Sequence, residues 1–320
     1  MEPWYAPISE DLAKVDRHLA DVLRSDRPEL QEMCDYVISA GGKKIRPAIC
    51  ILSHYACGGN KRDEVTRTAA AFELIHDATL IHDDINDKSE IRRGRKAVHA
   101  KYTVTKAVIL GDFIFAMGFK LIGTVDKRIV DTVVTASAAM AESEFIQKEF
   151  EHRPAVTEED YMNIIRGKTA MPIFAAARAG AYMADAPDGI VAAVSEFATA
   201  VGMAFQIVDD VLDVTGDRKT TGKTMGIDIA EGKPTLPVIY AMADPVRGKR
   251  IRSIFEKSAP SAEDLKEATE LIRGTDAADR CMAKAKETVE NAIPLLSCLN
   301  DSKYKDSLIG LARFFVSRDR

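Results

Sequence analysis

Residues 63–87 read DEVTRTAAAFELIHDATLIHDDIND, and they carry the clearest indication of the fold class. Its apolar side chains recur at steps of three and four residues, the spacing that puts them on one face of an α-helix. The residues that share this face are Ala69, Phe72, His76, Thr79, Leu80 and Asp83. The stretch therefore predicts a long helix that packs against a core and ends in acidic residues.

The same periodicity continues along most of the chain, which indicates an all-α protein. No alternating strand pattern and no linker rich in Pro, Gly or Ser interrupts it. We therefore expect one helical domain over residues 1–320, although a length of 320 residues alone would suggest two domains. The other expected helices cover residues 8–24, 28–39, 44–57, 104–124, 127–151, 158–184, 188–214, 228–243, 261–273, 276–297 and 301–317.

Composition narrows the class of protein. The 44 Lys and Arg residues against 49 Asp and Glu give a net charge of −5, which argues against a nucleic-acid partner. Residues 1–10 do not resemble a secretory signal, and the longest apolar stretch, 107–119, is shorter than the ~20 residues that span a bilayer. The five cysteines have no CxxC spacing, so neither a disulfide framework nor a zinc site is indicated. We expect a cytoplasmic protein without a membrane span.

The pattern DDxxD occurs twice, at residues 83–87 and 209–213. On a helix, residues i and i+4 lie on one face about 5–6 Å apart, so the outer aspartates of each motif point the same way. Like charges placed so close repel each other, and a hard divalent cation such as Mg²⁺ compensates for this repulsion.

A single DDxxD is more often a solvated acidic face than a metal site, because acidic residues are usually exposed. Here each copy follows a strongly apolar run, and the copies lie 126 residues apart on two helices that can face one another. The repetition therefore favours a metal-binding function over a solvated surface.

Basic residues gather near the same elements, as expected for a phosphate-binding site. They occur in GGKKIRP at 41–47, RRG at 92–94, GKT at 167–169 and 222–224, and at Lys233. Neither GKT has the preceding glycine of a P-loop, and neither follows a predicted strand, so nucleotide hydrolysis of that type is excluded. Acid pairs together with basic clusters predict a metal-bridged polyphosphate site.

At this level of detail the sequence resembles the trans-isoprenyl diphosphate synthase (polyprenyl synthetase) family. The family's landmarks appear in order as GGKKIRP, HDATLIHDDINDKSEIRRG, LGDFIFA, RGKT, FQIVDDVLD and GKTMGIDIAEGKPTLP. The resemblance covers the chain from about residue 36 onwards. It implies an all-α isoprenoid synthase bundle around a central cavity, usually in a homodimer.

The resemblance also implies roles for individual residues. Three Mg²⁺ ions would be held by Asp83 and Asp87 in one motif and by Asp209 and Asp213 in the other. The implied catalytic residues are Asp83, Asp84, Asp87, Lys168, Asp209, Asp210 and Asp213. The allylic diphosphate would bind Arg92, Lys168, Thr169, Gln206, Lys223 and Lys233. Isopentenyl diphosphate would bind Lys43, Arg46, His76, Arg93 and Arg318. One residue departs from expectation, because Asp77 is more polar than the resemblance leads us to expect beside His76.

The reaction implied is condensation of isopentenyl diphosphate with an allylic diphosphate by ionisation, bond formation and proton loss. No Ser/His/Asp arrangement suggests a separate side-chain base. In this family, side chains before the first acid motif set product length. Ala78 leaves the cavity open, and Phe72, about 16 Å along the helix from Asp83, is the candidate floor.

We expect a product in the geranylfarnesyl to heptaprenyl range, with geranylgeranyl diphosphate as the alternative. Two other functions stay open. A terpene cyclase would not need both acid motifs and an isopentenyl pocket. A non-catalytic subunit of a two-component synthase would typically have lost one of the motifs.

Overall fold

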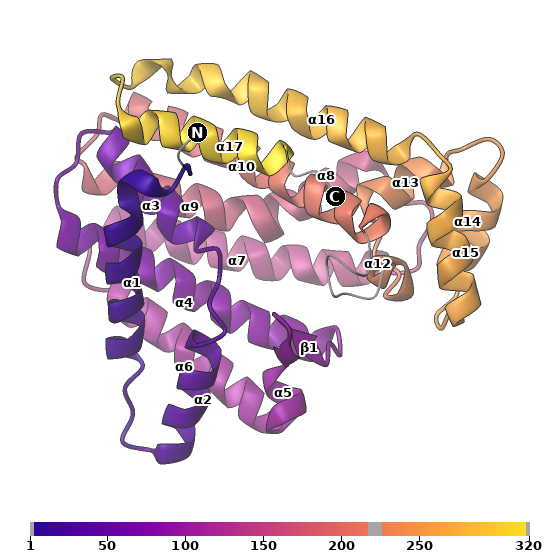
Figure 1. Cartoon of the computed structure of the whole chain (residues 1–320), viewed down its shortest axis with the longest axis horizontal. Coiled ribbons are helices and arrows are strands. Elements are labelled where there is room, and N and C mark those ends of the chain that lie inside the picture. Colours follow the sequence, from indigo (N-terminus) through magenta and orange to yellow (C-terminus); the bar gives the residue numbers. More distant parts are fainter. Residues whose placement is uncertain (1–2, 217–225, 318–320) are drawn as a thin grey trace. The chain divides into compact units, whose positions relative to one another are not determined.

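The computed structural model describes residues 3–216 and 226–317, and most of these residues are helical (Figure 1). Within the described ranges, the only strands are β1 (Ile91–Arg92) and β2 (Arg95–Lys96), which form an antiparallel hairpin that pairs Ile91 with Lys96. The prediction of an all-α protein is confirmed.

Most expected helices are present with bounds within a few residues of the prediction. The first half of the chain contains a 3₁₀ turn η1 (Ala6–Ile8), α1 (Ser9–Val22), α2 (Pro28–Ile38), α3 (Ile45–Ala56), α4 (Arg62–Asn86), α5 (Val98–Lys101), α6 (Val104–Ile122) and α7 (Lys127–Phe150). The second half contains α8 (Glu158–Ile165), a π turn η2 (Arg166–Ala170), α9 (Met171–Met183), α10 (Asp188–Thr215), α12 (Ile227–Ala230), α13 (Leu236–Met242), α14 (Gly248–Phe255), α15 (Ala262–Arg273), α16 (Ala277–Ala292), a 3₁₀ turn η3 (Ile293–Cys298) and α17 (Lys303–Val316).

Backbone packing divides the described residues into two compact units. The first unit comprises residues 3–134, 175–195 and 298–308. The second comprises residues 135–174, 196–216, 226–297 and 309–317. A single domain over residues 1–320 stays a prediction.

Helix α4 is the centre of the first unit, where it packs against α1, α3 and α6 (Figure 1). Three consecutive alanines, 69–71, are all fully buried, so neighbours surround α4 on more than the single face that its periodicity predicted. Gly118 lets α6 approach closely, because a Cβ there would lie 2.9 Å from Cγ1 of Ile75. The first acid motif thus lies at the end of a rigidly packed helix.

One hydrophobic cluster of the second unit is formed largely by α13, α14, α15 and α16, and it includes the fully buried Phe255. The expected continuous helix over 228–243 is wrong. The chain leaves helical geometry between α12 and α13, where Gly232 has a φ of +68° and Pro234 lacks a backbone donor. Helix α14 was not expected from the sequence.

The expected helix over 158–184 is interrupted by the π turn η2 at Arg166–Ala170. Two glycines allow this turn to lie against its neighbours. A Cβ on Gly167 would meet Oγ of Ser143 at 1.9 Å, and a Cβ on Gly202 would meet Cα of Ala170 at 2.7 Å. Turns of this kind inside helices occur frequently at functional sites.

Among the described helices, α10 is long and apolar enough to cross a bilayer by length and composition. More than half of its apolar window is buried inside the protein, which is typical of a core helix. The same helix carries the second acid motif near its end.

Candidate functional site

The first acid motif forms the C-terminal end of α4. The backbone N–H of Asp87 donates to the carbonyl of Asp83 at 2.8 Å, so helical spacing continues through the motif and the two outer carboxylates share a face, as predicted. Asp84, between them, is only 3% exposed. Its Oδ1 accepts hydrogen bonds from Nε (2.8 Å) and Nη2 (2.5 Å) of Arg92 on β1.

The next residue, Arg93, connects the hairpin to two other segments of the first unit. Its Nη1 donates to the carbonyl of Gly41 and lies 3.6 Å from Oδ1 of Asp77 on α4. A Cβ on Gly42 would lie 3.0 Å from Nη2 of Arg93 and 3.1 Å from Oε1 of Glu73. The glycine pair thus lets the guanidinium approach the backbone closely.

His76 and Arg46 lie in the same charged surroundings. Burial lowers the pKa of His76 well below its ordinary value, and the positive charges of Arg46, Arg93 and Arg92 lower it further. Burial likewise lowers the pKa of Arg46, while Glu73 and other carboxylates raise it. A neutral imidazole surrounded by guanidinium groups favours binding of an anion.

The two lysines before α3 lie at the edge of this cluster. Lys43 is exposed, and Lys44 forms an ion pair with Asp16. Lys44 has a φ of +48°, a left-handed conformation that costs ~1 kcal/mol or more in a residue other than glycine. The structure therefore brings together four residues predicted to bind diphosphate, Arg46, His76, Arg92 and Arg93, and places the exposed Lys43 on the segment that leads into α3.

The second acid motif lies inside α10, and again its second aspartate is the buried one. Asp209 is exposed, whereas Asp210 is 6% exposed. Oδ2 of Asp210 accepts from the hydroxyl of Tyr161 at 2.6 Å, and its Oδ1 accepts from Nε2 of Gln206 at 2.7 Å. Oε1 of Gln206 in turn accepts from the hydroxyl of Thr169 at 2.6 Å. Burial raises the pKa of Asp210 to about 7, although both donors lower it.

The π turn η2 places Lys168 beside this hydrogen-bonded chain. Lys168 forms an ion pair with Glu144 on α7, and its Nζ lies 3.4 Å from Oε1 of Gln147. Thr169, the next residue, is buried. The π turn therefore presents a cation and a hydroxyl within a short distance of the acid motif.

The segment around α12 brings further charged groups to the second motif. The backbone N–H of Asp228 donates to Oδ2 of Asp213 at 3.4 Å. Burial raises the pKa of Asp228 well above its ordinary value, and Asp213 and Asp210 raise it further. Lys233 forms an ion pair with Glu231 at 2.7 Å.

A cleft of about 100 Å³ lies beside the second acid motif. It is lined by Gln147, Tyr161, Ile164, Ile165, Lys168, Thr169, Gln206, Asp210, Asp228, Lys233, Pro234 and Thr235.

The donor chemistry of both motifs fits a hard divalent cation, because each supplies two carboxylates one helical turn apart. In the described ranges, no three His, Cys, Asp or Glu side chains come close enough to hold a metal by themselves. Mg²⁺ commonly binds one or two carboxylates together with substrate phosphates and water, so paired carboxylates suit it.

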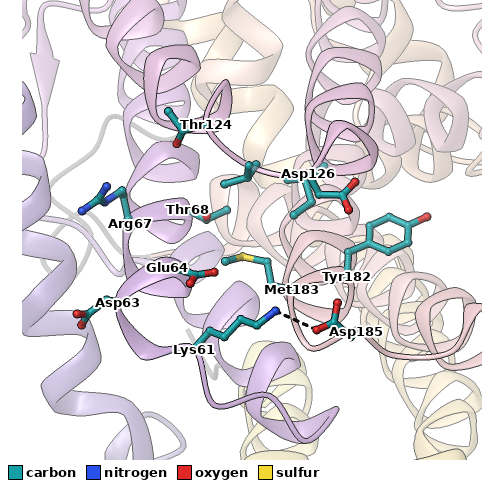
Figure 2. Close-up of a pocket in the computed structure, with 12 residues that line it drawn as sticks. Lys61, Asp63, Glu64, Arg67, Thr68, Thr124, Asp126, Tyr182, Met183 and Asp185 are labelled. Atoms are coloured by element: carbon teal, nitrogen blue, oxygen red, sulfur yellow. Dashed lines mark hydrogen bonds and ion pairs between the residues drawn. The ribbon is translucent and has the colours of Figure 1, made fainter.

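A larger cavity of about 460 Å³ lies at the opposite end of α4 (Figure 2). Lys61, Arg67 and four acidic residues line it, and Lys61 is paired with Asp185 at 2.9 Å. Thr68 in its wall is 15 residues before Asp83, about 22 Å along the helix. This cavity contains none of the predicted site residues, and its excess of carboxylates does not suit a diphosphate.

The two residues predicted to control chain length are both buried. Phe72 is 4% exposed and Ala78 is fully buried. Of the remaining predicted site residues, Lys223 and Arg318 lie outside the described residues.

Sequence reasoning missed several residues that contact the predicted ones. Glu144 and Asp228 are ordinary acidic residues in sequence, and Tyr161 carries no local signal at all. Glu73 could have been noticed, because it lies one helical turn before Asp77 and therefore on the same face.

Comparisons with known proteins agree with the sequence resemblance. A family model described as polyprenyl synthetase matches residues 27–272. The all-trans-nonaprenyl-diphosphate synthase (geranyl-diphosphate specific) of Rhodobacter capsulatus is 35% identical over 316 residues, 98% of this chain and 96% of its own. The geranylgeranyl diphosphate synthase of Methanosarcina mazei is 34% identical over 312 residues, 95% of each chain.

A solved structure is similar over nearly the whole chain. The polyprenyl synthase of Caulobacter crescentus, complexed with calcium and isoprenyl diphosphate, superposes with a TM-score of 0.91 and is 33% identical. The match covers 98% of this chain and 97% of that one.

Proposed function

The chain belongs to the polyprenyl synthetase family and is a trans-prenyltransferase, and from this premise we propose that it condenses isopentenyl diphosphate with an allylic diphosphate. The products are an all-trans polyprenyl diphosphate and free diphosphate. One observation carries the proposal. Each acid motif lies beside its own set of basic side chains, arginines near Asp84 and lysines near Asp210.

We propose that Asp83 and Asp87, and likewise Asp209 and Asp213, hold three Mg²⁺ ions together with the substrate. When bound, Mg²⁺ would neutralise the negative charge that develops on the leaving diphosphate. The similar synthase from Caulobacter crescentus was crystallised with calcium and isoprenyl diphosphate, and calcium also prefers oxygen ligands.

The proposed substrate-binding residues divide between the two diphosphates. Arg46, His76, Arg93, Lys43 and the C-terminal Arg318 are proposed for isopentenyl diphosphate. Arg92, Lys168, Thr169, Gln206, Lys223 and Lys233 are proposed for the allylic diphosphate. Three of these cations are already paired with carboxylates (Arg92 with Asp84, Lys168 with Glu144, Lys233 with Glu231), so they are held in place before a substrate arrives.

The reaction follows from this arrangement of charges. The bond between C1 and oxygen of the allylic diphosphate breaks, and the diphosphate leaves with the electron pair. The isopentenyl double bond then forms a bond to C1, and the departing diphosphate accepts the proton that is lost. Buried apolar helix faces exclude water, which would otherwise capture the cation.

For product length we propose the geranylfarnesyl to heptaprenyl range, with geranylgeranyl diphosphate as the alternative. The similar proteins include both a nonaprenyl and a geranylgeranyl diphosphate synthase, so both sides of this range occur among them. The change Ala78→Phe should shorten the product, because an aromatic ring would fill space before the acid motif. Phe72→Ala should lengthen it, and an unchanged distribution in both variants would contradict Phe72 as the floor.

We also propose that the enzyme is a homodimer that works in the cytoplasm. On α6, three branched aliphatic side chains are exposed: Val104 by 51%, Val108 by 41% and Ile109 by 58%. Exposure of neighbouring apolar side chains to water is unfavourable, so we propose that a second copy of the chain covers them. Sedimentation of the purified protein, with Ile109→Lys as a comparison, tests the dimer.

The decisive experiment incubates the purified chain with isopentenyl diphosphate, each allylic diphosphate primer and Mg²⁺, and reads products by length. A terpene cyclase would release diphosphate from the allylic substrate alone. A non-catalytic subunit would incorporate nothing until a partner protein is added. Absence of condensation by the isolated chain with every primer would overturn the proposed function.

A further inference from the structure

Asp77 is a buried carboxylate that the proposed reaction does not use. It is 7% exposed and lies on the face of α4 that also carries Asp84, seven residues later, two helical turns away. Each of these two carboxylates meets one arginine of the hairpin segment, Asp84 with Arg92 and Asp77 with Arg93. The two pairs attach that segment to α4 at two points.

The guanidinium of Arg93 has several partners. Its Nη1 lies 3.6 Å from Asp77 and donates to the carbonyl of Gly41. Glu73 attracts it electrostatically, and a Cβ on Gly42 would lie 3.0 Å from its Nη2, so there is little room for it to move on that side. This arrangement fixes the direction of a side chain that would otherwise sample many rotamers.

The backbone of Arg93 is itself in an unfavourable conformation. Its φ is +51°, and Gly94 follows at +75°. A residue other than glycine keeps such a conformation only where its surroundings determine it, and such residues concentrate at ligand-binding sites. The contact with Asp77 is one of the interactions that support it.

The charged and titratable groups around Asp77 come from every neighbouring element. Glu73 and Asp84 lie on its own helix, Arg46 and Lys44 lie at the start of α3, and Tyr36 lies on α2. The hairpin segment contributes Arg92, Arg93, Arg95 and Lys96. The surroundings are strongly basic, so the two carboxylates Glu73 and Asp77 offset charges that would otherwise repel one another.

We propose that Asp77 is a positioning residue that holds the guanidinium of Arg93 in the orientation that binds the diphosphate of isopentenyl diphosphate. The inference rests on the proposed function, and it adds a residue that acts through Arg93 without touching the substrate. Loss of its negative charge loosens Arg93 and weakens binding of that one substrate.

The protonation of Asp77 predicts a second measurable effect, a dependence of the KM for isopentenyl diphosphate on pH. Burial and the nearby Glu73 raise the pKa of Asp77 to about 7, against the lowering effect of Arg93, Arg46 and Lys44. A proton on Asp77 removes its attraction for Arg93. The KM for isopentenyl diphosphate should therefore rise as pH falls from about 8 to 6, beyond the change that the ionisation of the substrate itself causes.

The test is steady-state kinetics of Asp77→Asn, an exchange that keeps the shape of the side chain. At pH 8 the KM for isopentenyl diphosphate should rise about tenfold, the lower end of what is found when a partner that orients a ligand is removed. The kcat and the KM for the allylic primer should change little. The ratio of variant to wild-type KM should shrink toward one at pH 6, where wild-type Asp77 is protonated.

Two further variants separate positioning from stability. Asp11→Asn is the matched control, because Asp11 is also buried in the first unit and paired with an arginine, Arg62, at 2.6 Å. Arg62 begins α4, 15 residues and about 22 Å before Asp77, so this variant should alter thermal stability and leave the KM unchanged. In an Arg93→Ala background, adding Asp77→Asn should change the KM less than about twofold, because Asp77 acts through Arg93.

The outcomes are distinguishable. If wild type forms no elongated product, the proposed function fails. If wild type is active and Asp77→Asn leaves the KM for isopentenyl diphosphate unchanged at pH 8, or raises both KM values equally, the positioning role is wrong. A full effect of Asp77→Asn in the Arg93→Ala background also overturns it.

Discussion

The two acid motifs share a sequence pattern but differ in what supports their buried aspartate. On α4, Asp84 meets a cation, Arg92, through two hydrogen bonds. On α10, the described side chains that donate hydrogen bonds to Asp210 are both neutral, the hydroxyl of Tyr161 and the amide of Gln206. Both carboxylates are more than nine-tenths buried. Removing a charge from water costs free energy, and attraction to a buried partner of opposite charge offsets part of this cost. Hydrogen bonds from neutral donors offset less of it.

The difference shows that the buried aspartate of the same sequence motif can be stabilised either by a charged partner or by neutral hydrogen-bond donors. Burial raises the pKa of both carboxylates, that of Asp210 to about 7, and at Asp84 the positive charge of Arg92 opposes this effect. Asp84 therefore has a charged partner that favours its ionised form, whereas Asp210 gains or loses a proton near neutral pH. Each prediction below tests one side of this contrast.

The largest effect is expected from the outer aspartates, which are the proposed metal ligands. Asp83→Asn and Asp209→Asn should each lower kcat at least about 100-fold, because each removes a metal ligand and metal ions contribute several kcal/mol to such reactions. Product formation at saturating Mg²⁺ measures this. Asp63→Asn is the control, since this acid lies on α4 near the cavity of Figure 2. A near-normal rate for either motif variant would remove that motif from the proposed metal site.

The next effect concerns the charged partner of Asp84. Arg92→Gln should lower the free energy of unfolding by about 3 kcal/mol, the low end for breaking a buried pair, since Arg92 itself is one-third exposed. Urea unfolding measures the loss. Arg95→Gln is the matched control on the same hairpin, where the side chain is exposed and donates to the neutral carbonyl of Tyr36 and hydroxyl of Ser39. Equal losses in the two variants would show that Asp84 does not depend on the charge of Arg92.

The neutral surroundings of Asp210 predict a pH effect. The pKa of about 7 in the folded protein lies above the ordinary value of 3.8, so between these pH values the folded protein binds more protons than the unfolded chain. The free energy of unfolding therefore falls as pH rises through this window. Asp210→Asn lacks this contribution and should gain stability relative to wild type between pH 5 and 8, on the order of 2 kcal/mol.

Metal-free protein in a chelating buffer, unfolded at several pH values, measures the change. Asp84→Asn should give a smaller pH-dependent difference, because Arg92 compensates the charge of Asp84. If the free energies of unfolding of Asp84→Asn and Asp210→Asn depend on pH in the same way, the proposed difference between the two motifs is wrong.

The smallest effect is the loss of one neutral donor. Tyr161→Phe leaves Asp210 with one hydrogen bond fewer and should lower the free energy of unfolding by about 1–2 kcal/mol at pH 8, and by less at pH 5. Tyr240→Phe is the control in the same unit, because its hydroxyl donates at 2.7 Å to Glu158, a carboxylate that is more than one-third exposed. No difference between the two variants would mean that Tyr161 does not stabilise the ionised form of Asp210.

Much of the fold was predictable because helices follow from local periodicity. The bounds of α4 and α10 and the spacing of both acid motifs agree with expectation. The helix expected over 228–243 was wrong because Gly232 and Pro234 interrupt it within an otherwise helical pattern. The π turn at 166–170 was not foreseen, since it depends on the space that Gly167 and Gly202 leave against neighbouring helices.

The helical class and the paired carboxylates could be predicted from sequence because they follow from residue type and from spacing along one helix, and the family followed from the resemblance of several motifs in order. Folding in three dimensions sets the partner of each buried aspartate and the contact of Asp77 with Arg93. Sequence patterns do not reveal these contacts because burial and ion pairing depend on residues far apart in the chain. Tyr161 and Asp210 are 49 positions apart.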